Sequence, residues 1–172
     1  AGMFAFITAS PFLYMDYYSL SPAMYPVVFG ANVVVMASSN RLNILLLHYR
    51  SPQQNLRLGL GVQLLAASGL VLVVALGLDS LYTVVPLIML FMGQIGLITP
   101  NAMSSLLEKF SHMSATATAL LGSIQFSCGA LAGVLVGAFE VESPWPMVLT
   151  MLGVSTLGNL GLRFLVRRDA NT

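Results

Sequence analysis

The sequence has very little charge and almost no cysteine. Only 8% of its 172 residues are Asp, Glu, Lys or Arg, whereas a typical soluble domain has about 25%. A soluble chain with so few charges would expose large apolar patches and aggregate. The single cysteine, Cys128, excludes a disulfide framework and a cysteine metal cluster. The net charge of +1 comes without a basic run, so nothing indicates a nucleic-acid partner.

Catalytic signatures are also missing. The sequence contains no HExxH, CxxC, GxSxG or Walker motif. The two histidines, His48 and His112, lie far from Ser68 or Ser127, so no catalytic triad can be proposed. No Asp, Glu or His lies within an apolar run where it would obviously relay a proton. We therefore expect a protein that is not an enzyme and that holds no metal ion or cofactor.

Long apolar runs are what the sequence does have. It is 57% hydrophobic, and about 20 apolar residues cross the hydrocarbon core of a bilayer as a helix. The first run has 15 residues, which is short for a span and suggests a helix truncated at its beginning. We predict one all-α integral membrane domain, residues 1–172, with six transmembrane helices at about 1–15, 23–47, 58–78, 81–107, 115–139 and 145–166.

The turns between these runs separate the charges by sign. Alternate turns must lie on the same face of the membrane, and one face receives Asp16, Asp79, Glu140 and Glu142 without any Lys or Arg. The opposite face receives all seven basic residues, namely Arg41, Arg50, Arg57, Lys109, Arg163, Arg167 and Arg168. The positive-inside rule predicts that this face is cytoplasmic, with both chain ends and the loop bearing Arg50 and Arg57.

Polar side chains recur within the predicted spans. Asn32, Ser39 and Asn43 are spaced by seven and four residues, which places them on one helical face. Such a stripe either hydrogen-bonds to neighbouring helices or lines a water-filled path. Arg41 either extends to the cytoplasmic headgroups or faces a cavity.

Small residues predict close helix contacts. Gly129, Gly133 and Gly137 form two overlapping GxxxG steps in the fifth run, which allow two helices to approach backbone to backbone. The fourth run contains Pro86 and Pro100, which are expected to kink it.

Four segments carry a resemblance to a known family. They are AGMFAFITASPFLYM at Ala1–Met15, LSPAMYPVVFGAN at Leu20–Asn32, PNAMSSLLEKFSHMSATATALLGSIQF at Pro100–Phe126 and SPWPM at Ser143–Met147. Together they resemble the Bcr/CflA family, the bicyclomycin-resistance-type drug exporters of the major facilitator superfamily. Members have two six-helix halves, and this chain resembles the second. The resemblance implies a bacterial inner-membrane protein whose partners are small-molecule drugs, the lipid bilayer and a missing N-terminal half.

The resemblance also implies a mechanism and a site. It implies drug efflux by alternating access, with the proton gradient as the energy source and the coupling carboxylate in the absent half. Cavity-facing positions are implied for Ser10, Tyr14, Asn32, Gln94 and Gln125. Gln94 and Gln125 also fall near the middle of their runs, the depth at which transporter sites concentrate. The alternative is a membrane interaction or assembly subunit that transports nothing.

Overall fold

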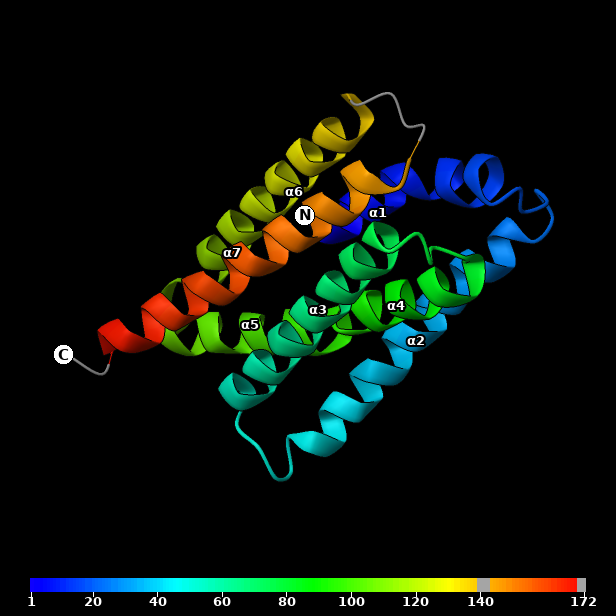
Figure 1. Ribbon diagram of the computed structural model, residues 1–172. Helices are drawn as coiled ribbons and strands as arrows, with labels where there is room; N and C mark the ends of the chain where they lie inside the picture. Colours follow the sequence, from blue (N-terminus) through cyan, green and yellow to red (C-terminus); the bar gives the residue numbers. More distant parts are fainter. Residues whose placement is uncertain (139–142, 170–172) are drawn as a thin grey trace.

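The computed structural model is a bundle of helices, with no strand in the residues that it describes, 1–138 and 143–169 (Figure 1). The all-α prediction is therefore confirmed. The helical elements in chain order are α1 (Gly2–Pro11), the π-helical turn η1 (Phe12–Tyr17), α2 (Tyr25–Leu46), α3 (Pro52–Ala75), α4 (Leu81–Gly93), α5 (Ile95–Lys109), the 3-10 turn η2 (Ser111–Met113), α6 (Ser114–Ala138) and α7 (Trp145–Asp169).

Four stretches of the described chain are long and apolar enough to cross a membrane. They are Pro52–Ala75, Leu81–Lys109, Ser111–Ala138 and Trp145–Phe164. α1 has only ten residues, and α2 has Asn32, Asn40, Arg41 and Asn43 within it. Glu140 and Glu142, the end of the fifth predicted span at Phe139, and the side chains of Arg167 and Arg168 lie outside the described residues.

The first helix continues past the predicted turn at Asp16. Pro11 has no N–H to donate to the carbonyl of Ile7, and the Ser10 hydroxyl donates to that carbonyl instead, at 3.1 Å. After Pro11 the helix widens into η1, where the Tyr18 N–H bonds the Leu13 carbonyl at 3.1 Å. Asp16 is thus helical rather than part of a turn.

α3 begins earlier than its apolar run. The Ser51 hydroxyl accepts from the Gln54 N–H, and the Gln54 side chain accepts from the Ser51 N–H. This reciprocal capping box, followed by Pro52 in the first turn, fixes the start of a helix. The prediction that Arg57 lies in a loop is therefore wrong, because the cap places Arg57 inside α3, whereas Arg50 does precede the helix.

The fourth apolar run is divided at Gln94, not at its prolines. Pro86 and Pro100 both lie inside helices. At Gln94 the N–H bonds the Phe91 carbonyl, three residues back, and α4 gives way to α5. The neighbouring Gly96 lies against α2, where an added Cβ would be 2.5 Å from the Met36 carbonyl oxygen. The interruption thus lies beside a close crossing of the α2 and α5 backbones that only glycine permits.

α3 runs through the centre of the bundle and packs against α4, α5 and α7. α2 lies against α4 and α5 on one side, and α1 lies against α6 and α7 on the other (Figure 1). The core is apolar and aromatic, and its largest fully buried side chains include Tyr14, Phe6, Phe91, Leu13, Leu70, Ile88, Met147 and Met151.

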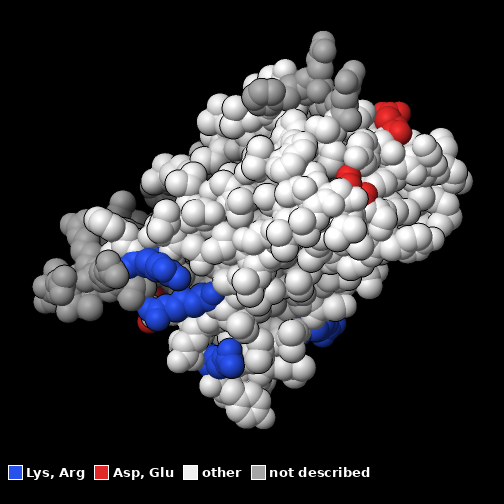
Figure 2. Space-filling model, viewed as in Figure 1, with Lys and Arg blue, Asp and Glu red and all other residues white. Residues whose placement is uncertain are grey.

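The two ends of the bundle differ in charge. Figure 2 shows Lys and Arg gathered where α3 begins and α7 ends, with most of the acidic atoms toward the opposite end. We call these the basic end and the acidic end. At the acidic end the Tyr17 hydroxyl donates to Asp79 at 2.7 Å, which joins η1 to the turn before α4.

The sides of the bundle expose large apolar side chains. Leu65, Leu157 and Phe164 are 71%, 69% and 75% exposed on α3 and α7. Such surfaces are unfavourable in water and suit contact with lipid chains or with other transmembrane helices.

Candidate binding cavity

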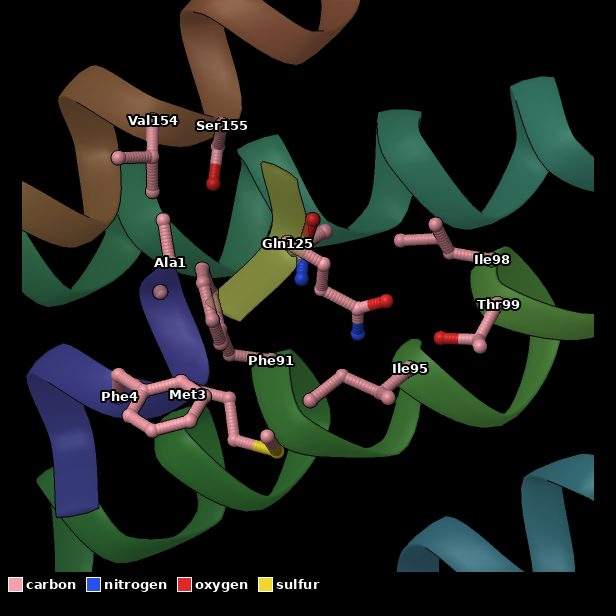
Figure 3. A pocket seen from close by; sticks show the side chains of 12 residues that line it. Ala1, Met3, Phe4, Phe91, Ile95, Ile98, Thr99, Gln125, Val154 and Ser155 are labelled. Carbon is pink, nitrogen blue, oxygen red and sulfur yellow. The ribbon is translucent and has the colours of Figure 1, made fainter. Parts of the chain in front are cut away.

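A cavity of about 210 Å³ lies where α1 meets α3 to α7 (Figure 3). Its apolar wall includes Met3 and Phe4 of α1, Phe91 of α4 and Ile95 of α5. Figure 3 shows these side chains around one opening, with α1 along one side of it.

Four polar side chains reach this cavity from different helices. They are Gln63, Thr99, Gln125 and Ser155, and Figure 3 shows the last three directed toward the opening from α5, α6 and α7. The Ser155 hydroxyl donates to the Met151 carbonyl at 2.7 Å. Gln63, Thr99 and Gln125 make no side-chain hydrogen bond with any residue that the structure describes. Their two amides and one hydroxyl are therefore available to a bound molecule.

Gln94 does not share this cavity. It is 8% exposed, and its Nε2 donates to the Leu90 carbonyl of its own helix at 3.2 Å. Gln125, by contrast, is exposed and lines the cavity. The structure thus separates two amides that depth alone had placed together.

Ser10, Tyr14 and Asn32 meet at a second polar position, between α1, η1 and α2. Ser10 and Tyr14 are fully buried and Asn32 is 3% exposed. The Ser10 hydroxyl shares a hydrogen bond of 3.0 Å with the Tyr25 hydroxyl, and the Tyr14 ring lies 6.1 Å from the Tyr25 ring. The hydroxyl of Tyr14 and the side-chain oxygen of Asn32 have no hydrogen-bond partner in the described chain. This group is closed off from the cavity.

Asn43 joins three helices at the basic end. Its side-chain oxygen accepts from Asn55 of α3 at 3.1 Å and from Asn101 of α5 at 2.6 Å, and all three residues are buried. Asn101 also donates to the Leu97 carbonyl. Of the two explanations for the stripe of Asn32, Ser39 and Asn43, hydrogen bonding between helices accounts for Asn43.

The glycines of α6 face α1. A Cβ added at Gly129 would lie 2.5 Å from the Phe4 ring, and one at Gly133 would lie 3.0 Å from the Thr8 hydroxyl. At Gly137 the nearest atom, of Thr8, would be 3.8 Å away. Gly122, nearer the N-terminus of the same helix, has no such neighbour within 4 Å.

Two curated proteins are similar to this chain. A bicyclomycin resistance protein homologue of Haemophilus influenzae is 31% identical over 168 residues, which cover 98% of this chain and 42% of the relative, in its C-terminal part. The chain is thus a homologue of the C-terminal part of a bicyclomycin resistance protein homologue. An uncharacterised MFS-type transporter of Bacillus subtilis, YdgK, is 27% identical over 159 residues, which cover 92% of this chain and 39% of that protein. No family model and no solved structure matches.

The chain spans about two fifths of the length of these curated relatives. The relatives and the apolar helices together indicate a multi-pass membrane protein. Both relatives are named for transport or resistance, so the prediction that the chain is not an enzyme is confirmed. The resemblance to the second half of a Bcr-type transporter is confirmed as well.

Several residues of the polar sites in this chain could not be selected from the sequence. Gln63 and Thr99 are single polar residues in apolar runs, and nothing in the sequence distinguishes those that line a cavity. Asn55 fell in a predicted loop, although the Ser51-Pro52-Gln53-Gln54 segment has the spacing of a capping box and would have placed it in a helix.

Proposed function

We propose that this chain forms the C-terminal half of a proton-coupled exporter of small amphipathic drugs. The observation that carries the proposal is the cavity beside Gln125. There the Gln63 and Gln125 amides and the Thr99 hydroxyl, which have no other partner in the described chain, accompany aromatic and aliphatic side chains. Sites for small ligands combine an apolar wall with a few convergent polar groups. The names of the two relatives, a bicyclomycin resistance protein homologue and an MFS-type transporter, agree with this chemistry.

We further propose that all six helical units cross the membrane. α1 with η1, and α2, would join the four long apolar stretches. The first unit, Gly2–Tyr17, is shorter than the others. The proposed location is the bacterial inner membrane, with the basic end in the cytoplasm, because basic residues are retained on that side.

The second half of the drug site would come from the rest of the transporter. A cavity of about 210 Å³ is smaller than the roughly 300–1,000 Å³ of typical ligand pockets. Both relatives extend well beyond the matched segment, so we propose a six-helix N-terminal half as the partner of this bundle. The two halves would expose the shared site to each side of the membrane in turn.

The proton-coupling group is proposed to lie in that N-terminal half. The predicted spans of this chain contain no Asp or Glu, and proton relays within membranes use Asp, Glu or His chains. The role proposed for this half is therefore to bind and orient the drug while the other half carries the proton.

Gln125→Leu tests the drug site in the full-length transporter. If Gln125 contacts drugs, the variant should reach the membrane normally but change the resistance profile, with polar drugs affected more than apolar ones. The matched control is Gln53→Leu, the same substitution at an exposed position of the first turn of α3, outside the cavity. Unchanged export of every tested drug by Gln125→Leu would refute the site. Loss of expression would assign Gln125 a structural role.

A further inference from the structure

Two arginines lie on neighbouring helices at the basic end. Arg57 belongs to α3 and Arg163 to α7, and both are exposed. The two helices pack along each other and run in opposite directions (Figure 1). A hydrogen bond of 2.9 Å from the Asn159 side chain to the Leu60 carbonyl joins them.

That bond places both arginines at one depth. Arg57 precedes Leu60 by three residues and Arg163 follows Asn159 by four, so each is about one turn nearer the basic end. Three or four residues along a helix return to nearly the same face. Both arginines therefore lie close to the line along which α3 and α7 meet.

The positive charge along this line is not neutralised from within the described chain. Neither Arg57 nor Arg163 forms an ion pair or hydrogen bond with a described residue. Two like charges on adjoining helices repel each other, and an anion bound by both would relieve the repulsion. Guanidinium groups bind phosphate through paired, parallel hydrogen bonds.

The surface beside these arginines is apolar. On α7, Leu160 and Phe164 are 56% and 75% exposed, and on α3 Leu58 is 38% exposed. A soluble anion would gain nothing from these side chains, whereas a phospholipid would place its acyl chains along them. The partner that fits both features carries a phosphate and hydrocarbon chains.

We propose that Arg57 and Arg163 bind the phosphate of an anionic phospholipid, whose acyl chains lie along the exposed faces of α3 and α7. Basic positions between transmembrane helices on the cytoplasmic side are suited to such headgroups. The lipid would bridge the two helices at the end where the Asn159 bond already joins them. The site is separate from the cavity beside Gln125, and it does not depend on the exporter assignment.

The test is binding of phosphatidylglycerol to the purified full-length protein, counted by native mass spectrometry. Phosphatidylcholine with the same acyl chains provides the zwitterionic comparison. Arg57→Gln and Arg163→Gln should each weaken phosphatidylglycerol binding about fivefold, the factor that corresponds to about 1 kcal/mol per arginine near a membrane surface. Arg50→Gln removes the same charge from the loop before α3 and should leave binding unchanged.

Three results would overturn the proposal. An equal loss in Arg50→Gln would mean that only the overall charge of the basic end matters. Equal binding of phosphatidylcholine would mean that the phosphate charge is not recognised, and binding of inorganic phosphate as strong as that of the lipid would mean that the site takes a free anion. If a glutamine variant is not recovered folded, the test is the salt dependence of phosphatidylglycerol binding by the wild type. Binding must weaken as salt is raised, and binding that does not weaken would overturn the proposal.

Discussion

The side-chain amide of Asn101 donates a hydrogen bond of 2.6 Å to the side-chain oxygen of Asn43, which lies 58 residues earlier in the chain. Asn55 donates to the same oxygen. One buried acceptor thus links the end of α2 and the start of α3, on either side of the loop bearing Arg50, to the middle of α5.

Asn43→Leu should lower the melting temperature of the full-length protein. The change leaves the Asn55 amide without an acceptor, whereas Asn101 retains the Leu97 carbonyl. A buried polar group without a partner costs about 1–3 kcal/mol. Asn40→Leu, at an exposed position of the same helix, is the control and should have little effect. Equal melting of the two variants would mean that the asparagine cluster does not stabilise the bundle.

Gly96→Ala should be strongly destabilising, because the added methyl group meets backbone atoms that cannot rotate away. It would lie 2.5 Å from the Met36 carbonyl oxygen and 2.8 Å from the Asn40 nitrogen. Forcing a methyl group into such a contact costs typically about 1–3 kcal/mol. Gly122→Ala has open space and should melt like the wild type. The measurement is the melting temperature of both variants in one detergent. Identical melting curves for Gly96→Ala and Gly122→Ala would contradict the close crossing of α2 and α5.

Gly133→Leu should reduce the folded yield of the full-length protein, because a leucine side chain would separate α6 from Thr8 of α1. Gly122→Leu makes the same change where α6 has no neighbour within 4 Å. Size-exclusion chromatography of the two variants gives the comparison. If both are recovered like the wild type, this face of α6 does not depend on contact with α1.

Ser51→Cys should resist a membrane-impermeant thiol reagent in intact cells, because the loop before α3 is proposed to be cytoplasmic. The assay requires a Cys128→Ser background, since Cys128 is exposed and is the one cysteine in the sequence. Ser80→Cys, in the turn before α4 at the acidic end, should be labelled in the same cells. Labelling of Ser51→Cys from outside would reverse the proposed orientation.

The helical architecture could be predicted from the sequence because it depends on local properties. Runs of apolar residues determine where helices form in a membrane, whatever their neighbours. The first turn of α3 was missed although its signal, the Ser51 capping box, is also local. The reading of that segment as a loop rested on its polarity, which does not distinguish a loop from a capped helix start.

The partners of polar residues could not be predicted in the same way. Gln94 and Gln125 are both central amides in apolar runs, yet one bonds within its own helix and the other faces the cavity. Which occurs depends on how each helix is rotated against its neighbours. The crossing of two backbones beside Gly96, next to the interruption of the fourth run, could not be predicted for the same reason.

The interruption at Gln94 has a mechanical consequence. It divides a 29-residue apolar stretch into two helices, α4 and α5. Phe91 of α4 is buried in the core near α1. Asn101 of α5 is hydrogen-bonded to Asn43, which also binds Asn55, near the ends of α2 and α3. A tilt of α5 about Gln94 would therefore move the joined ends of α2 and α3 with it.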